Sequence, residues 1–407
     1  MSVAENTAID MARAPAAAKL LLNMLQRVRI GTLTVTLPGG GHHCYGGKEP
    51  GPTAFLEIKS WQACQRILRS GDIGLAEAYR DHEVEISDIP SLLLLAMANE
   101  DEIKQAFEGS FIGKATYLFR HFLLNRNTRK GSKRNIHAHY DLGNGFYHLW
   151  LDPGMTYSSA IFANPEVSLE QAQTAKYERI LSQLNVNAGD HILEIGCGWG
   201  GFAEYAARSR GVRVTGISLS KEQLKWAAER VKGTDIESLC EFRFQDYRDV
   251  TGQYDAVVSI EMIEAVGQPF WPSYFGKIHE MLKPGGMAGI QAITIRDDLF
   301  YNYSRSTDFI QQFIFPGGML LSPEKISQQA HKAKLTITDQ YAFGKDYAET
   351  LRRWRSDFEQ KINLIRQQGF DDAFLRIWRF YYTYCEAGFD AGRTDVYQVM
   401  MRKEITD

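Results

Sequence analysis

A glutamate followed by a cluster of glycines stands near the middle of the chain. In the segment LEIGCGWGG, Glu194 ends an apolar run and is followed by Gly196, Gly198, Gly200 and Gly201. Glycine allows a tight turn and lets a ligand approach the backbone, because no Cβ stands in the way. A helix that begins after such a turn offers unpaired N–H groups and a positive dipole end, which favour an anionic group. The segment predicts a site for a small charged ligand, although glycines required only for close packing would look the same.

Polar residues also follow two later apolar runs. The first run ends in GISLSKEQ, about 20 residues after the glycines, where a ribose-binding group is expected. The second run ends in FQDYRDV, in which Asp246 could accept a hydrogen bond from an adenine amino group. The glycine segment fits GxGxxG only loosely and lacks the GK[ST] of a phosphate loop, so it does not indicate an ordinary nucleotide triphosphate site.

Alternating strands and helices are needed to position these segments. From about residue 175, the predicted helix EQAQTAKYERILSQL precedes the strand HILEIGC, and the helix GGFAEYAARSR precedes the strand VRVTGISLS. The alternation continues through CEFRFQDY, YDAVVSIEMI and MAGIQAITI. This pattern predicts βαβ units and a doubly wound, parallel α/β sheet. Ligands of such sheets bind outside the carboxyl ends of the strands, where the glycine segment would lie.

A smaller α+β domain is predicted for residues 1–115. RIGTLTVTLPGGGHHCYGG has the alternation of a strand, a glycine turn and a second strand, GPTAFLEIKS predicts another strand, and WQACQRILRSG predicts a helix. The basic stretch RHFLLNRNTRKGSKR indicates a linker over residues 116–138. The alternative for this stretch is a patch that attracts anionic lipid headgroups. The catalytic domain would then span residues 139–407.

Composition narrows the class of protein. A chain of 407 residues with a net charge of −3 is long enough for two domains and lacks the basic balance of a general nucleic-acid binder. The five cysteines are odd in number and without CxxC spacing, which argues against a disulfide framework or zinc site and favours a reducing cytoplasm. We find no apolar stretch of the roughly 18 residues that span a bilayer.

Six separated segments together carry a specific resemblance. They are HYDLGNGFYHLWLDPGMTYSSAIF, LEIGCGWGG, GISLSKEQ, FIFPGGMLLS, FGKDYAETLRRW and YYTYCEAGFDAGRTDVYQVM, in this order. From about residue 130 onward, the chain resembles the cyclopropane-fatty-acyl-phospholipid synthases, which are S-adenosylmethionine-dependent class I methyltransferases. The N-terminal 115 residues are similar to the extra domain of the phospholipid-acting members. The resemblance implies a Rossmann-like fold with lid helices inserted at about residues 300–390.

The resemblance also implies a reaction and a cofactor site. A methyl group of S-adenosylmethionine would be transferred to the cis double bond of an unsaturated phospholipid acyl chain, giving a cyclopropane through a carbocation. Aromatic faces can stabilise such a cation. The enzyme would be cytoplasmic, peripherally associated with the inner membrane and able to form a homodimer. The residues expected at the cofactor are Tyr157, Ser158, Glu194, Gly196, Gly198, Gly200, Ser218, Leu219, Gln223, Gln245, Asp246 and Tyr247.

In the family, a bound bicarbonate ion accepts the proton that is lost as the ring closes. By resemblance, Glu264 matches the glutamate of the bicarbonate site, Tyr347 its tyrosine, and Ile293 the isoleucine that gives a backbone contact. Cys385 matches a cysteine of the C-terminal pocket. Glu264 follows an apolar strand, where an unpaired carboxylate is costly to bury, so function is favoured over a structural ion pair. Tyr347 and Cys385 could instead serve only in packing.

Three positions depart from the pattern of the family. Ser159 stands where a cysteine is expected, Gln291 where a histidine is expected, and Ala265 where a histidine follows the glutamate. Serine and glutamine can still hydrogen-bond an oxyanion, but they lack the charge and titration of the family residues. These changes leave open whether the product is a cyclopropane or a methyl- or methylene-branched chain.

Other interpretations are kept alongside this one. His137 and His139 have no third ligand at a suitable spacing, so we expect no metal site. The segment 309–329 could line an acyl tunnel or form a plain amphipathic cap. A methyltransferase for a small soluble acceptor, and a non-catalytic lipid-binding protein that kept the cofactor fold, remain as alternative functions.

Overall fold

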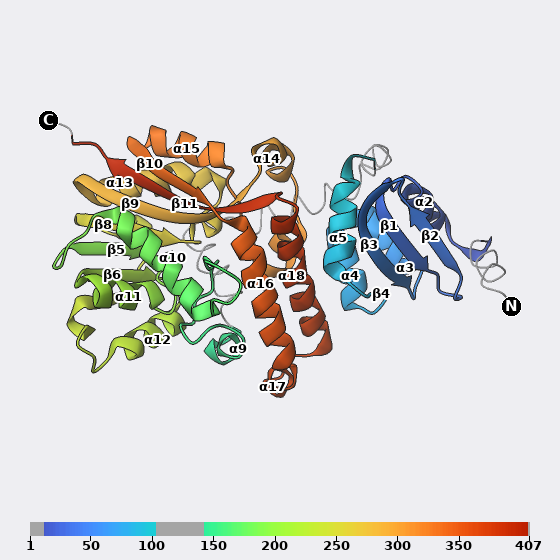
Figure 1. Ribbon diagram of the computed structural model, residues 1–407, viewed down its shortest axis with the longest axis horizontal. Coiled ribbons are helices and arrows are strands. Elements are labelled where there is room, and N and C mark those ends of the chain that lie inside the picture. Colours follow the sequence, from blue (N-terminus) through green and yellow to red (C-terminus); the bar gives the residue numbers. More distant parts are fainter. Residues whose placement is uncertain (1–11, 103–141, 406–407) are drawn as a thin grey trace. The chain divides into compact units, whose positions relative to one another are not determined.

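A computed structural model describes residues 12–102 and 142–405 (Figure 1). The predicted linker 116–138, His137 and His139 lie outside the described residues. The chain forms two compact units, each made of three segments. Unit 1 consists of Met1–Phe122, Ser306–Ile314 and Arg366–Ala391, and unit 2 consists of Leu123–Arg305, Phe315–Ile365 and Gly392–Asp407.

Unit 2 is built on a seven-stranded sheet with the order β10-β11-β9-β8-β5-β6-β7. Its strands are β5 (His191–Ile195), β6 (Arg213–Ser218), β7 (Cys240–Phe244), β8 (Tyr254–Ile260), β9 (Leu282–Ile295), β10 (Leu335–Ala342) and β11 (Thr394–Lys403). The five strands from β5 to β9 are parallel, as the alternating pattern predicts. The order reverses at β5, whose neighbours are β6 and β8, so the carboxyl end of β5 is the switch point of the sheet.

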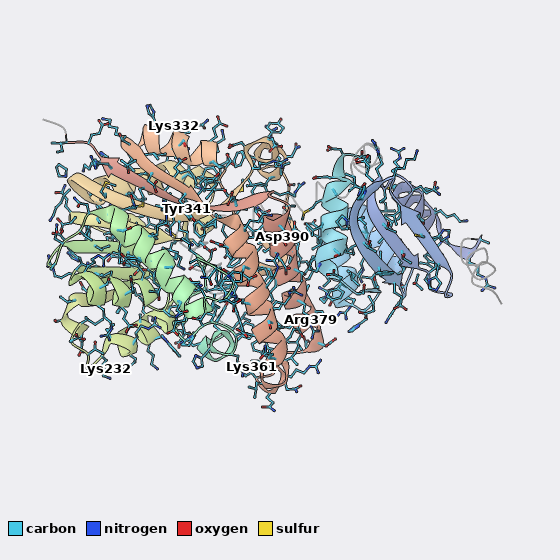
Figure 2. All side chains as sticks on the ribbon, viewed as in Figure 1. Lys232, Lys332, Tyr341, Lys361, Arg379 and Asp390 are labelled. Atoms are coloured by element: carbon cyan, nitrogen blue, oxygen red, sulfur yellow. The ribbon has the colours of Figure 1, made fainter. Side chains whose placement is uncertain are left out.

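Two antiparallel strands, β11 and β10, extend the sheet beyond β9. Arg179 hydrogen-bonds to both of these strands. It donates to Asp339 Oδ2 on β10 at 2.6 Å and to Gln398 Oε1 on β11 at 3.0 Å. Its guanidinium also lies 4.2 Å from the ring centroid of Tyr341, which Figure 2 labels on β10. The region 300–390, in which lid helices were expected, therefore contains a strand of the sheet as well as helices.

Helices cover both faces of the sheet and enclose two cores. One core lies under α10 (Leu169–Leu184) and α11 (Gly201–Arg210), with α12 (Lys221–Val231) beside them. The other lies under α13 (Trp271–Met281) and α15 (Pro323–Lys332). Successive residues of β5 alternate between them: Ile192 faces the first core and Leu193 the second. The doubly wound α/β fold is therefore confirmed.

The remaining elements of unit 2 lie in its connecting segments. The α-helices are α9 (Asn144–His148), α14 (Asp297–Tyr303) and α16 (Gly344–Gln360), and α17 (Ile362–Gln367) spans the boundary between the units. The 3-10 helices are Glu237–Leu239, Tyr247–Asp249, Ile263–Ala265 and Gln268–Phe270. Helix α10 begins with a capping box, in which Ser168 accepts from the backbone of Gln171 while the Gln171 side chain accepts from the backbone of Ser168.

Unit 1 contains the predicted small α+β domain. Its sheet has the order β2-β1-β3-β4, formed by β1 (Ile30–Thr36), β2 (His42–Gly46), β3 (Glu49–Ile58) and β4 (Val84–Ile86). Its helices from the N-terminal segment are α2 (Ala16–Leu25), α3 (Gln62–Ser70), α4 (Asp72–Arg80) and α5 (Ile89–Ala98). The predicted strands and the predicted helix of this domain are all present.

Two distant segments complete unit 1. The π-helix Ile310–Ile314 and helix α18 (Asp372–Asp390) belong to it, although both lie in the part of the sequence expected to form the catalytic domain. Helix α18 packs against α4 and α5. Its buried Arg376 donates to the carbonyl oxygens of Tyr79 and Val84 and to the carboxylate of Glu85.

Candidate active site

The glycine segment forms the turn between β5 and α11. Gly196, Gly198 and Gly200 have φ values of 84°, 51° and 83°, in the left-handed region that glycine adopts without strain. A Cβ on Gly196 would lie 2.8 Å from Met262 Cγ, whereas a Cβ on Gly198 would meet nothing within 4 Å in the part of the chain that the structure describes. Gly198 therefore presents bare backbone to open space at the switch point, which suits the close approach of a ligand.

Two side chains hold this turn in place. The indole nitrogen of Trp199 donates to Asn144 Oδ1 at 2.8 Å, and Trp199 packs against Tyr147 with a centroid distance of 5.2 Å. Arg230 donates to the carbonyl oxygen of Trp199 at 3.1 Å and to that of Gly154 at 2.8 Å. These contacts give Trp199 a packing role in the turn.

Glu194, at the end of β5, carries an unpaired acceptor. Its side chain is buried, and Oε2 has no hydrogen-bond partner among the described residues. Burial raises the pKa of Glu194 to about 8, and the charge of nearby Lys176 acts in the opposite direction. Since buried polar atoms are almost always hydrogen-bonded, this oxygen fits a cationic or N–H donor of a bound molecule. Together with Gly198, it matches the amino-acid portion of S-adenosylmethionine.

The second and third polar segments lie at the carboxyl ends of β6 and β7, as predicted. Ser218 Oγ donates to Gln223 Oε1 at 3.0 Å, which orders the turn into α12 that also contains Leu219. Asp246 is engaged by Arg248, with Nε at 2.8 Å from Oδ1 and Nη2 at 2.6 Å from Oδ2. Its role toward an adenine amino group stays a prediction.

The neighbours of Asp246 have structural contacts of their own. Gln245 donates from Nε2 to the carbonyl oxygen of Asp249 at 2.9 Å. Tyr247 is buried and packs edge-on against Tyr274, with a centroid distance of 5.5 Å. Their roles toward a cofactor also stay predictions.

Tyr157 lies in a cluster of aromatic rings in unit 2. Its ring centroid lies 5.4 Å from that of Tyr147, 5.6 Å from Trp150 and 5.3 Å from Trp354. Trp354 in turn meets Tyr347 at 6.1 Å. The cluster is a low-dielectric, electron-rich environment that can stabilise a positive charge.

A carboxylate that the sequence prediction missed, Glu261, lies at the centre of the predicted bicarbonate site. The backbone N–H of Ser159 donates to Glu261 Oε1 at 2.8 Å, and Gln291 Nε2 donates to the same oxygen at 2.7 Å. The hydroxyl of Tyr347 donates to Glu261 Oε2 at 2.7 Å. Burial raises the pKa of Glu261, whereas Lys176 and these three donors act to lower it. The structure therefore brings Ser159, Gln291 and Tyr347 together around one carboxylate.

Glu264 lies one helical turn further on, in the 3-10 helix after β8. Its Oε1 accepts from the backbone N–H of Ile293 at 2.5 Å, and its buried Oε2 has no hydrogen-bond partner among the described residues. Burial, and then the proximity of Glu261, raise the pKa of Glu264 to about 8. The N–H of Ile293, which was expected to contact bicarbonate, thus donates to the carboxylate of Glu264 instead.

Lys176 is a fully buried cation beneath this network. Its Nζ donates to Ser158 Oγ at 2.6 Å. Burial lowers the pKa of Lys176 to about 7, while the charges of Glu261, Asp152 and Glu194 oppose that shift. Lys176 therefore connects the cofactor end of the site, at Glu194, electrostatically with the carboxylate network at Glu261.

Cys385 belongs to a different compact unit from the other predicted site residues. It lies on α18 in unit 1, whereas all the other predicted site residues belong to unit 2. Burial, with a smaller effect of Asp308, raises the pKa of the Cys385 thiol far above its usual value. Such a thiol is a poor nucleophile, so its surroundings suit packing better than chemistry.

The positions of Glu261 and Lys176 in the sequence contain features that could have identified both as candidate site residues. Glu261 directly follows the apolar run AVVSI, at the carboxyl end of β8, where polar residues of these sheets often meet a ligand. Lys176 lies four residues after buried Ala172 and four before buried Ile180, so it occupies the buried face of α10. A charged residue at such a position needs a partner, and this requirement points to function.

Comparison with known proteins identifies the family. Residues 127–399 match the family described as mycolic acid cyclopropane synthetase. The chain belongs to this family. Its relatives include the tuberculostearic acid methyltransferase UfaA1 of Mycobacterium tuberculosis, 36% identical over 98% of this chain and 97% of the relative. The cyclopropane-fatty-acyl-phospholipid synthase of Escherichia coli K12 is 32% identical over 86% of this chain and 88% of the relative.

Solved structures of mycolic acid cyclopropane synthetases agree with this assignment. The synthase CmaA1, crystallised with SAH and CTAB, is similar with a TM-score of 0.63 and 28% identity, over 67% of this chain and 98% of that one. The chain is therefore an S-adenosylmethionine-dependent methyltransferase that modifies lipids. The bare backbone at Gly198 and the unpaired oxygen of Glu194 fit this cofactor.

Within residues 12–102 and 142–405, no three or more His, Cys, Asp or Glu side chains are grouped so as to hold a metal ion. In the same ranges, no helix combines the length and the apolar character required to cross a membrane.

Proposed function

We propose that the chain transfers a methyl group from S-adenosylmethionine to a cis double bond in an unsaturated phospholipid acyl chain. One observation carries this proposal: Tyr347 joins the aromatic cluster around Tyr157 to the carboxylate of Glu261. Methylation of an alkene creates a carbocation in an oily chain, and this reaction needs both a cation-stabilising surface and a group that accepts a proton. A methyl transfer to an amine or hydroxyl has no such need for aromatic faces.

Bound S-adenosylmethionine would supply an electrophilic methyl group on sulfur. The chain's own contribution is positioning: Gly198 and Glu194 would hold the amino-acid part, and Ser218 and Gln223 order the turn at the ribose end. An acyl chain brought to the aromatic cluster would place its double bond in a region from which water is excluded. The phospholipid as substrate implies action at a membrane surface.

Cyclopropane formation is the first product that we propose, in line with the family. A methyl- or methylene-branched chain is the second, and a specific observation favours it. The relative UfaA1, a methyltransferase by name, matches the chain almost from end to end, and Ser159, Gln291 and Ala265 replace family residues at the proton-accepting site. Both products pass through the same methylated cation and differ in what happens to its proton.

The test uses the purified full chain with trideuteriomethyl-labelled S-adenosylmethionine and vesicles of a monounsaturated phospholipid. We expect release of S-adenosylhomocysteine and a lipid heavier by one carbon unit, with one deuterium of the transferred group lost. Vesicles of the corresponding saturated lipid are the control and should give neither. For NMR the product is made with unlabelled S-adenosylmethionine, because the label would replace the diagnostic protons with deuterium. Upfield ring protons then identify a cyclopropane, and vinylidene protons identify a methylene branch.

Two results would reject the proposal. Turnover that proceeds equally without vesicles would indicate a small soluble acceptor. Cofactor binding in calorimetry without any heavier lipid, for unsaturated vesicles of both anionic and zwitterionic headgroups, would remove the acyl chain as substrate.

A further inference from the structure

Building on the proposed function, we propose that the carboxylate of Glu261 is the base that accepts the proton of the transferred methyl group. In this role it replaces the bicarbonate ion of the family, so the chain would carry its own proton acceptor and need no bicarbonate. A side-chain carboxylate and bicarbonate share a planar O–C–O group and a single negative charge, so one can occupy the position of the other.

The donors expected around bicarbonate are already engaged by side chains of this protein. The positions carried over from the family are Ser159, Gln291, Tyr347 and the backbone of Ile293. The first three converge on Glu261, at distances of 2.7 to 2.8 Å. The fourth, the N–H of Ile293, donates to Glu264. A bicarbonate ion placed at this point would have to displace a carboxylate from its hydrogen bonds.

A chain of hydrogen bonds fixes Gln291 as a donor toward Glu261. Arg179, which can only donate, reaches Gln398 Oε1 at 3.0 Å, so the amide nitrogen of Gln398 faces the other way. That nitrogen donates to Gln291 Oε1 at 3.1 Å. The Gln291 amide nitrogen is thereby directed at Glu261 Oε1, at 2.7 Å. The protein thus orients its donors for an anion at the position of Glu261.

The count of hydrogen bonds leaves one site on Glu261 for a substrate proton. Each carboxylate oxygen has about two acceptor positions. Those of Oε1 are filled by Ser159 and Gln291, whereas among the described residues Oε2 accepts only from Tyr347. Oε2 is also the oxygen bonded to Tyr347, whose ring meets Trp354 of the aromatic cluster. Oε2 is therefore the atom that would take the proton.

The backbone of Glu261 is held in a conformation that glutamate rarely adopts. Its φ is 49°, in the left-handed region, which costs a residue with a side chain about 1 kcal/mol or more. Glycine would remove this cost. Retention of glutamate at a strained position in the site suggests that its carboxylate is needed there.

The chemical step balances without any further reactant. The π electrons of the double bond form the new C–C bond to the methyl carbon, and the adjacent carbon becomes cationic. The bond between that methyl carbon and sulfur breaks at the same time, and its electron pair stays on sulfur, giving S-adenosylhomocysteine. A C–H bond of the added methyl then breaks: the proton goes to Glu261 Oε2, and the electron pair closes the ring. If a hydride first shifts to the cationic carbon, the same electron pair forms the double bond of a methylene branch. Glu261 ends neutral and returns its proton to water.

The first experiment measures bicarbonate directly by ¹³C NMR, independently of turnover. We expect wild-type protein to leave the line width of ¹³C-labelled bicarbonate unchanged. The variant E261G opens the space and relieves the backbone, and it should broaden the bicarbonate signal. Binding of bicarbonate to the wild-type chain would overturn the proposal, even if no lipid substrate had been found.

The second experiment measures turnover in carbon-dioxide-free buffer. Wild-type activity should be unchanged when bicarbonate is removed or restored. E261Q keeps the shape of the side chain but cannot accept the proton, so its rate should fall by about 10²- to 10⁴-fold, the usual contribution of a general base. Its affinity for S-adenosylmethionine and its melting temperature should stay near wild type, which excludes misfolding.

The rate of E261G should recover in part when bicarbonate is added, whereas that of E261Q should not. Full activity of E261Q, or wild-type activity that depends on bicarbonate, would overturn the proposal. Failure of the proposed function would look different, because the wild-type chain would then methylate no lipid in either buffer.

Discussion

At the residue scale, the site depends on one buried cation among several carboxyl groups. Lys176 is fully buried, and the groups that act on its pKa are Glu261, Asp152 and Glu194. In a low-dielectric interior, removal of one charge changes the protonation of its neighbours more than at a surface. Lys176 is thus a positioning residue that keeps Glu261 ionised, and its effect should be visible in the dependence of activity on pH.

The variant K176Q should lose activity selectively at low pH. Cationic Lys176 lowers the pKa of Glu261, so its removal raises that pKa, and less Glu261 is ionised below neutrality. We expect kcat of K176Q to fall roughly three- to tenfold at pH 6, because a smaller fraction of Glu261 is then ionised. At pH 8.5 we expect little change in kcat, because Lys176 of the wild-type protein is already largely neutral there. A pH–rate profile of methyl transfer measures this shift.

The control is K332Q, since Lys332 is an exposed lysine on α15 that Figure 2 labels. Its profile should follow that of the wild-type protein. An equal loss of K176Q activity at both pH values would indicate a purely structural role for Lys176.

At this scale the sequence located some residues of the buried network and missed others. Glu264, Tyr347, Gln291 and Ser159 were named because they occupy positions that match a family motif, and their roles stay predictions. Glu261 was not named, because the resemblance assigned no role to its position. Only the distances from Glu261 to Ser159, Gln291 and Tyr347 reveal it.

At the scale of elements, the turn between β5 and α11 is the part of the site most closely determined by sequence. Apolar residues of β5 alternate between two cores, and the glycines that follow have the positive φ values that only glycine adopts freely. Periodicity and glycine spacing therefore located this turn correctly. They could not predict β11 and β10, whose antiparallel pairing depends on long-range register.

The variant G198A should weaken cofactor binding more than it weakens the fold. Its Cβ would meet nothing within 4 Å among the described residues, so the cost to stability is that of a left-handed φ, about 1 kcal/mol. The added methyl would, however, lie where we expect the cofactor to approach the backbone. We expect the affinity for S-adenosylmethionine to fall about tenfold or more, as roughly 1.4 kcal/mol of lost contact requires. Isothermal titration calorimetry measures it.

A matched control exists in the same unit. Gly233 also has a positive φ, 72°, and a Cβ added there would meet nothing within 4 Å, but it follows α12 at the far end from the glycine turn. G233A should lose a similar amount of stability and keep its affinity for S-adenosylmethionine. If the two variants lose affinity equally, Gly198 does not face the cofactor.

At the scale of the whole molecule, neither compact unit is formed by one continuous stretch of the sequence. Composition and motifs led to an expected boundary near residue 115, and the N-terminal sheet was predicted from its alternating strands. The packing of Ser306–Ile314 and α18 in unit 1 was not predicted. Helix α18 is amphipathic and rich in aromatic residues. Such a pattern predicts that one face of a helix is buried, but it does not predict which other element packs against that face.

The final prediction concerns Arg376, which connects α18 to the N-terminal part of unit 1. Its guanidinium donates to the carbonyl oxygens of Tyr79 and Val84 and lies 3.8 Å from the ring centroid of Tyr79. In R376M both carbonyls lose the guanidinium, although the Tyr79 carbonyl still accepts from the N–H of His82 at 3.2 Å. A buried polar group left unsatisfied costs about 1–3 kcal/mol. We therefore expect unit 1 to open more readily, whereas unit 2, with its own cores, keeps its stability.

Hydrogen exchange followed by mass spectrometry separates these two outcomes. Peptides from α4, β4 and α18 should exchange about tenfold faster or more in R376M, because each 1.4 kcal/mol changes an opening equilibrium tenfold. Peptides from β5, β8 and β9 should be unchanged. The control K361M alters an exposed lysine directly after α16, labelled in Figure 2, and should leave both sets unchanged. If α18 exchanges faster in R376M while α4 and β4 do not, the contact of Arg376 does not hold unit 1 together, since the loss of a shared contact must release both of its sides.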